Sequence, residues 1–94
     1  MDIARSDIVR SIAGRDKGKV FFVLDAKDEF LMLADGKTRK LENPKRKKRK
    51  HTAFVKSCDH GVAEKIRSEE KVTNSELRRT LAEYGGDGNP DQEG

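Results

Sequence analysis

Two short apolar runs near the start of the chain are separated by a basic turn that two glycines bracket. The runs cover residues 8–12 and 20–24, and the turn between them reads GRDKGK, residues 14–19. Because the runs are so close in sequence, they can pair as strands only if the chain reverses direction at this turn. Glycine allows the positive backbone angles that a tight reversal needs. The pattern therefore predicts a β-hairpin whose tip carries Arg15, Lys17 and Lys19.

The composition limits the chain to one small domain. Of its 94 residues, 33% are apolar and 40% are charged, so the core must be small. The longest apolar runs, residues 20–24 and 30–34, are far shorter than the ~20 residues that span a bilayer. The first residues show no signal-peptide pattern, and the single cysteine, Cys58, suits a reducing compartment. We expect a cytoplasmic protein.

The net charge of +4 is unevenly distributed. Residues 1–56 have a net charge of +8, and residues 57–94 have a net charge of −4. Such a division is typical of a basic binding module with an acidic appendage.

Between residues 7 and 55, short β-like runs alternate with turn signals. Asp35-Gly36 is a two-residue hairpin signal, and Asn43-Pro44 breaks the pattern again. Five strands without a long helix between them are typical of a small antiparallel barrel. The expected strands cover residues 8–12, 19–24, 29–34, 38–41 and 51–55.

The chain beyond residue 57 has a helical pattern. Residues 61–70 predict one short helix. Thr73 and Glu76 match a capping box, and Leu77, Leu81 and Tyr84 recur at helical spacing, which predicts a helix over residues 74–84. Residues 85–94 are expected to be disordered. The chain thus divides into a β module (1–56), a helical extension (57–84) and a tail (85–94).

Residues 7–53 resemble a KOW module, the small barrel found in ribosomal proteins and transcription-elongation factors. The stretch AGRDKGK, residues 13–19, is the most specific part of this resemblance. The chain is similar to large-subunit ribosomal proteins of archaea and eukaryotes that open with the motif, and more so to short bacterial KOW-containing RNA-binding proteins. The other matching positions are Val9, Ser11, Phe22-Val23, Leu31, Leu33, Asp35-Gly36, Arg39-Lys40 and Lys50-His51.

The resemblance implies a mainly β, SH3-like barrel that binds structured RNA, ribosomal RNA in the first place, through its first hairpin turn and its basic loops. It therefore implies a role in translation. The tail from residue 57 onward lies outside the resemblance. By position, the implied RNA-binding residues are Arg15, Lys17, Lys19, Lys37, Arg39 and Lys40.

A run of six cations at residues 45–50 independently favours a nucleic-acid partner, because phosphate contacts supply most of the non-specific affinity. Six consecutive side chains cannot all face one way, and their mutual repulsion favours an extended loop that wraps a folded RNA. A solvated charge run or a nuclear-import signal is the alternative. The further RNA-binding candidates are Lys45, Arg46, Lys47, Lys48, Arg49, Lys50 and His51.

Base stacking on aromatic rings is the usual route to sequence-specific RNA recognition. Strand alternation places most of the four phenylalanines in the core. Phe21 faces opposite to Val20 and Phe22 and is the best candidate for an exposed ring, although packing in the core or against the tail is favoured for it as well. We therefore expect recognition of RNA by shape and phosphate. The four are Phe21, Phe22, Phe30 and Phe54.

Two roles are open for the helix over residues 74–84. Its single apolar stripe favours packing over an open end of the barrel, and docking on a protein partner is the other role. The charge division also raises the hypothesis that acidic side chains shield the basic surface in the absence of RNA. These are Glu64, Glu69, Glu70 and Glu76.

We expect no enzymatic activity, no cofactor and no metal. The basic turn lacks the spacing and the Ser or Thr of a phosphate-binding P-loop. Cys58, His60 and His51 lack zinc spacing and a fourth ligand, and Cys58 has no obvious cleft in which to act as a nucleophile. The alternatives to RNA binding are a protein–protein adaptor of the translation or transcription machinery and a DNA-binding protein.

Overall fold

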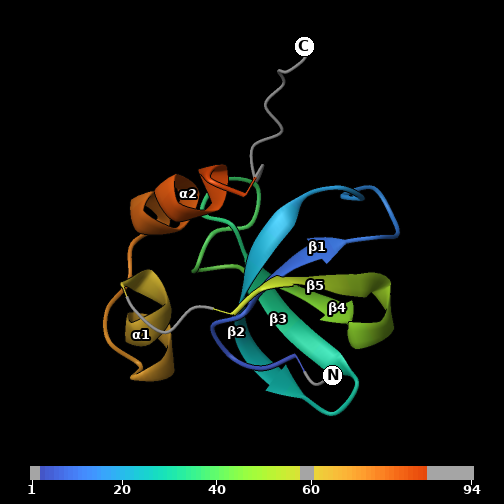
Figure 1. Ribbon diagram of the computed structural model, residues 1–94, viewed down its shortest axis with the longest axis horizontal. Coiled ribbons are helices and arrows are strands. Elements are labelled where there is room, and N and C mark those ends of the chain that lie inside the picture. Colours follow the sequence, from blue (N-terminus) through green and yellow to red (C-terminus); the bar gives the residue numbers. More distant parts are fainter. Residues whose placement is uncertain (1–2, 58–60, 85–94) are drawn as a thin grey trace.

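The computed structural model describes residues 3–57 and 61–84, which form a five-stranded sheet and two short α-helices (Figure 1). The strands are β1 (Ile8–Ser11), β2 (Val20–Lys27), β3 (Phe30–Ala34), β4 (Lys45–Lys48) and β5 (Thr52–Lys56). A 3-10 helix, η1 (Arg49–His51), joins β4 to β5. The helices are α1 (Val62–Arg67) and α2 (Asn74–Ala82).

The sheet is antiparallel throughout, with the strand order β4-β3-β2-β1-β5. The predicted mainly β class is therefore confirmed. The sheet is not closed into a barrel by hydrogen bonds, because β4 and β5 are its two edges and do not pair with each other.

The sheet is covered on both of its faces. Central strand β2 buries four consecutive side chains, Val20 to Val23, and consecutive strand residues point to opposite faces. Val20 and Phe22 pack with the helices in one cluster, and Phe21 and Val23 pack in the other, inside the curl of the sheet. The possibility that Phe21 presents an exposed ring is therefore wrong. Phe21 is fully buried, in agreement with the packing that was favoured for it.

The predicted β1–β2 hairpin is confirmed. Val9 pairs with Phe21, and Arg10 pairs with Val20. Beyond these pairs, the amide of Gly18 donates to the carbonyl of Ser11 at 2.8 Å, which closes the turn. Gly18 has φ of +95°, a conformation that glycine adopts without strain.

The strand expected over residues 38–41 is absent, and this expectation was wrong. The Asp35 carboxylate accepts hydrogen bonds from the backbone amides of Lys37 and Arg39 at 2.9 and 2.8 Å and from the Thr38 hydroxyl at 2.7 Å. These bonds coil the chain locally into an Asx-type turn, a known alternative to strand pairing. Further on, the amide of Leu41 donates to Asn74 Oδ1 at 2.8 Å, so this segment is hydrogen-bonded to a side chain of α2 and not to the backbone of β3.

The fourth strand is formed by the basic run. Residues 45–48 pair with β3 in register, from Leu33 opposite Lys45 to Phe30 opposite Lys48. The extended loop predicted for residues 45–50 is therefore wrong, because β3 supplies backbone partners and a carboxylate described below neutralises part of the charge. The last strand begins at Thr52, after η1, close to the position expected for it.

Both predicted helices are present, each slightly shorter than expected. The capping box is confirmed: the Glu76 amide donates to Thr73 Oγ1 at 3.2 Å, and the Thr73 amide donates to Glu76 Oε1 at 2.9 Å. Leu77 and Leu81 on α2 and Ile66 on α1 pack on the sheet in the first cluster. Packing of the helix on the β module is therefore confirmed, but it covers one face of an open sheet and not the open end of a barrel. The predicted disordered tail, residues 85–94, lies outside the described residues.

We predict that Gly36→Ala destabilises the protein by about 1–3 kcal/mol more than Gly18→Ala. Both glycines have positive φ, +79° and +95°, so alanine introduces similar backbone strain at each. At Gly36 the added Cβ would also lie 2.2 Å from the carbonyl oxygen of Asn74, whereas at Gly18 it meets nothing within 4 Å. Urea unfolding of the two variants measures the difference, and equal losses would refute the close approach of loop and helix.

Candidate nucleic-acid interface

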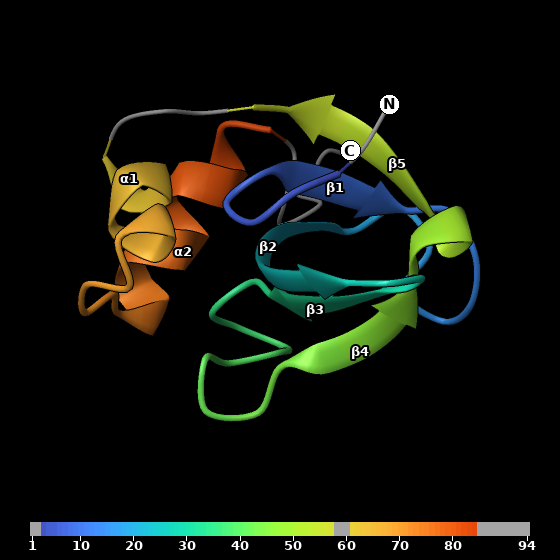
Figure 2. The same cartoon turned by 90° about the horizontal axis from the view of Figure 1, so that it is seen from below.

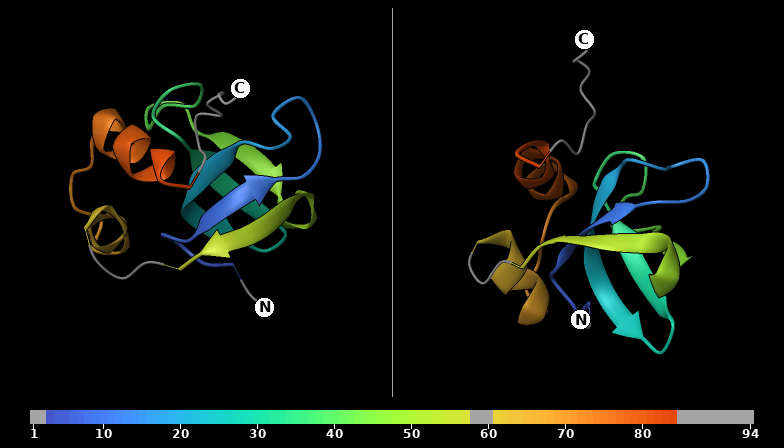
Figure 3. Two further views of the ribbon diagram at one scale, coloured as in Figure 1. Left: turned by 45° about the horizontal axis from the view of Figure 1, so that its top comes forward. Right: turned by 45° about the vertical axis from the view of Figure 1, so that its right-hand side comes forward.

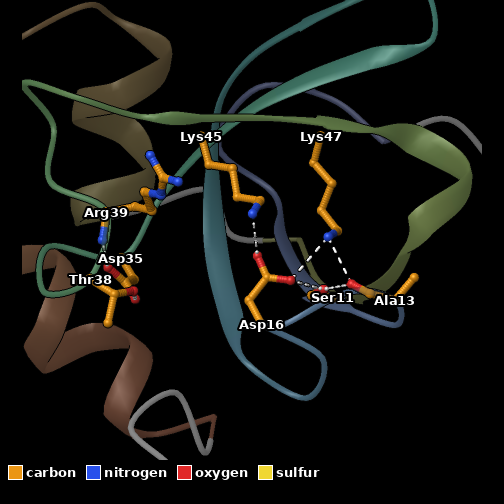
Figure 4. A network of polar contacts seen from close by, with 8 residues as sticks. All are labelled: Ser11, Ala13, Asp16, Asp35, Thr38, Arg39, Lys45 and Lys47. Carbon is orange, nitrogen blue, oxygen red and sulfur yellow. Dashed lines mark hydrogen bonds and ion pairs between the residues drawn. The ribbon is translucent and has the colours of Figure 1, made fainter.

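One carboxylate, that of Asp16, connects the tip of the β1–β2 hairpin to the edge strand β4 (Figure 4). Its Oδ1 accepts hydrogen bonds from the Ser11 hydroxyl at 2.7 Å and from the Lys47 ammonium at 3.0 Å. Its Oδ2 lies 3.2 Å from the Lys45 ammonium. Lys47 also donates to the carbonyl of Ala13 at 2.9 Å. We call this group, Asp16 with Ser11, Ala13, Lys45 and Lys47, the Asp16 clasp.

The clasp is largely shielded from water. The side chain of Asp16 is 13% exposed and that of Lys47 is 8% exposed. Burial opposes ionisation of the carboxyl group, but hydrogen bonds from Ser11, Lys47 and Lys45 outweigh it and lower the pKa of Asp16 from 3.8 to about 2. Asp16 is therefore ionised at neutral pH, and removing one of its partners leaves a buried charge less well compensated.

Strand geometry divides the basic run into two sets of side chains. Lys45 and Lys47 point to one side and enter the clasp, whereas Arg46 and Lys48 are exposed on the other. The guanidinium carbon of Arg46 lies 4.3 Å from the centroid of the Phe30 ring, a cation–π contact. The six cations that were expected to act together thus include some that hold the fold and some that face solvent.

Arg49 belongs to the set that holds the fold. Its Nε donates to the carbonyl of Asp28 at 3.0 Å, and its Nη1 donates to the carbonyl of Ile3. Its backbone amide donates to the carbonyl of Glu29 at 2.7 Å. Arg49 therefore fixes η1 against the β2–β3 turn, while its neighbour Lys50 is exposed.

The hairpin tip and η1 lie together at one end of the molecule, and α1 and α2 lie at the other (Figures 2 and 3). The two parts are joined directly, because the amide of Ile12 donates to the carbonyl of His51 at 2.9 Å. This end presents a group of exposed cations together with a half-buried histidine. We call it the cationic end, and it consists of Arg15, Lys17, Lys19, Lys48, Lys50 and His51.

The remaining predicted cations, Lys37, Arg39 and Lys40, form a separate group. They lie on the loop between β3 and β4, which packs beside α2, where Arg78 donates to the carbonyl of Gly36 at 2.8 Å. Figure 4 shows Arg39 on the opposite side of Lys45 from Lys47. The structure therefore does not bring this group together with the cationic end.

The helical glutamates, which were hypothesised to shield the basic surface, do not cover the cationic end. Glu69 pairs with Arg5 at 3.0 Å, and Glu76 pairs with Lys65 at 2.8 Å. Glu76 belongs to α2, and Glu69 follows the end of α1. Both helices lie on the other side of the molecule from the hairpin tip (Figure 1). Between residues 61 and 84, Lys/Arg and Asp/Glu are equal in number, so the described helices have no net acidic charge.

Neither the comparison with protein-family models nor the search of curated proteins finds a match to this chain. Within residues 3–57 and 61–84, His, Cys, Asp and Glu form no cluster of three that would hold a metal ion. Cys58 and His60, considered above for metal binding, lie outside these residues. Among the helices of the described ranges, none combines the length and the apolar character needed to cross a membrane.

Sequence reasoning missed the organising role of Asp16. The available signal was its position as the one acidic residue within a basic turn, between Arg15 and Lys17. Its partners Lys45 and Lys47 are distant in sequence and were assigned to a loop, so their pairing with Asp16 was not foreseeable. Phe54 was among the four candidate rings, but Phe21 was preferred to it, because the exposure of Phe54 depends on the position of β5 at the edge of the sheet.

We predict that Lys47→Met lowers the free energy of unfolding by about 2–3 kcal/mol, because it removes the buried ammonium and leaves Asp16 with Ser11 and Lys45 alone. Lys48→Met is the matched control, since it makes the same chemical change at the next position of β4, where the side chain is exposed. It should alter stability by no more than about 0.5 kcal/mol. Urea unfolding measures both variants, and similar losses would contradict the division of the run.

We predict that stability falls as pH is lowered from about 4 to about 2. When folding lowers the pKa of a carboxyl group, that group stabilises the folded protein at pH values above the pKa it has in the unfolded state. This contribution is lost as the pH falls to the pKa that the group has in the folded state. Asp16 contributes about 2 kcal/mol in this window. Glu76 titrates in the same range, because the Lys65 ammonium and the Thr73 amide lower its pKa to about 2.

Comparison with Asp16→Asn separates the two carboxyl groups. The variant should be less stable at pH 7 and should lose less stability on acidification, because the contribution of Asp16 is gone while Glu76 and Glu42, whose pKa values folding also lowers, still contribute. Thermal unfolding across this pH range measures the difference. An unchanged acid dependence in the variant would show that Asp16 is not held ionised by the clasp.

Proposed function

We propose that the protein binds structured RNA through the cationic end. The observation that carries this proposal is the grouping of exposed cations from two separate segments, the hairpin tip and η1, beside the Asp16 clasp. Asp16, the acidic residue of the tip, is turned inward onto Lys45 and Lys47, so its charge is compensated inside the fold. Phosphate groups approaching this end meet mainly positive charge, which favours a polyanionic partner.

The fold supports the KOW-type interpretation of the sequence. An antiparallel sheet in the order β4-β3-β2-β1-β5, with a 3-10 turn between the last two strands, is what an SH3-like module would have. The hairpin tip, which the resemblance implicates in RNA contact, belongs to the cationic end. Ribosomal RNA, and thus a role in translation, is the target that the resemblance favours.

The rigidity of the cationic end favours a folded RNA over a flexible strand. Arg49 and the Asp16 clasp hold η1 and the hairpin against the sheet, so the backbone segments that carry the cations are held in place. Cations on a preorganised surface lose less conformational freedom on binding and match phosphates that are themselves held at fixed spacing. The basic run acts here through two of its exposed members, Lys48 and Lys50.

We predict that Lys17→Gln/Lys19→Gln weakens binding to an RNA stem-loop and makes the dependence of log K on log salt shallower by about 1.5–2, one counterion equivalent for each lost phosphate contact. Fluorescence anisotropy over a range of KCl concentrations measures both quantities.

The matched control is Lys71→Gln/Arg79→Gln, which removes the same charge from exposed positions in the helical part. It should leave the salt dependence nearly unchanged. Equal effects of the two double variants would mean that affinity follows net charge alone, and the cationic end would then not be the binding site.

A further inference from the structure

An open groove lies beside the cationic end and contains an exposed aromatic ring. Among the described residues, Phe54 and Ile12 are the large apolar side chains that remain exposed, at 38% and 45%. Phe54 lines a groove of about 470 Å³, within the range of small-ligand sites. The lining residues are Ile3, Glu29, Arg49, Lys50, Thr52 and Phe54.

The groove is held open by contacts from Arg49. Its guanidinium group bonds to the carbonyls of Ile3 and Asp28, and its amide bonds to the carbonyl of Glu29. These bonds fix the N-terminal segment and the β2–β3 turn on one side of the groove. On the other side, η1 leads directly into β5, the edge strand that carries Phe54. Both walls are therefore parts of the rigid fold.

Charge connects the groove to the cationic end. Lys50 belongs to both, and η1 lies between the hairpin tip and the β2–β3 turn, as the two views of Figure 3 show. A ring by itself would be an ordinary exposed apolar residue. A ring in a preformed groove with a cation at its rim has the two elements that bind a nucleotide: a surface on which a base stacks and a charge for its phosphate.

We propose that the groove binds one unpaired nucleotide of the RNA, with its base against the ring of Phe54 and its phosphate beside Lys50. This inference rests on the proposed function and deepens it. The cationic end holds the paired, folded part of the RNA, and the groove receives a nucleotide that leaves the helix next to it, such as a bulged or loop nucleotide. Stacking requires an unpaired base, so a continuous duplex cannot occupy the groove.

Glu29 gives the groove a means to select among bases. Glu29 lines the same groove as Phe54 and its side chain is exposed, and a carboxylate accepts hydrogen bonds from exocyclic amino groups. Cytosine, adenine and guanine each present such a group, whereas uracil offers only its ring N3–H as a donor on that edge. The groove should therefore prefer an amino-bearing base over uracil, and Glu29→Gln should reduce this preference, because an amide can donate as well as accept.

The test compares short fluorescein-labelled oligocytidylate and oligouridylate with a blunt RNA duplex, all at one salt concentration. Phe54→Ala should lower the affinity for oligocytidylate by about five- to a hundredfold, the effect of losing one base–aromatic stack, and leave duplex affinity unchanged. Ile12→Ala is the control, because it removes the other exposed apolar side chain, outside the groove. Oligouridylate should bind the wild-type protein more weakly than oligocytidylate does.

Phe54→Trp provides a second readout. The sequence contains no tryptophan, so quenching of the introduced indole by oligocytidylate reports stacking at this position directly. The variant should retain its affinity for oligocytidylate. The groove proposal alone is overturned in two cases, provided that the wild-type protein binds the duplex. In the first, Phe54→Ala changes the affinities for oligocytidylate and for the duplex equally, or changes neither of them. In the second, oligocytidylate does not quench the indole fluorescence. If the wild-type protein binds no RNA, the proposed function fails and the groove proposal fails with it.

Discussion

The ion pairs of Asp16 with Lys45 and Lys47 join two parts of the sheet that the strand order keeps apart. The carboxylate comes from the tip of the β1–β2 hairpin, and both ammonium groups come from the edge strand β4. Since charges this poorly exposed are costly unless they are paired and hydrogen-bonded, the hairpin and β4 stabilise each other's position. The side chain of Ser11 and the carbonyl of Ala13 add hydrogen bonds to Asp16 and Lys47. The curl of the sheet and the position of the hairpin tip both depend on this contact.

The clasp also explains how a strand of four consecutive cations can exist. In a strand, alternate side chains face opposite ways, so one carboxylate on one side compensates Lys45 and Lys47 together. Lys48 and Lys50 are then left facing solvent, beside the cations of the hairpin tip. Stability and binding thus draw on different members of one basic run. Its charge density serves folding on one side of the strand and, in our proposal, phosphate recognition on the other.

The elements that sequence reasoning predicted well are those with local signals. The β1–β2 hairpin depends on the turn at residues 14–19, and the start of α2 depends on Thr73 and Glu76, which are three residues apart. The fourth strand was misplaced because its position depends on distant partners. The Asp35 carboxylate accepts hydrogen bonds from the amides of Lys37 and Arg39, so these residues do not continue as a strand. Asp16 neutralises part of the basic run, whose charges would otherwise disfavour strand pairing. For the binding surface, the cations of the hairpin tip were identified, whereas the inward role of Lys47 and the exposure of Phe54 depend on tertiary packing.

In our proposal, RNA binds the end of the molecule that the Asp16 clasp organises. Titration of the isotope-labelled protein with an RNA stem-loop, followed by amide chemical shifts in NMR spectra, tests it most directly. We expect the largest shift changes at residues 14–19 and 48–51, with little change over α1 and α2. Changes concentrated on the two helices, or on the loop of residues 35–44, would contradict it.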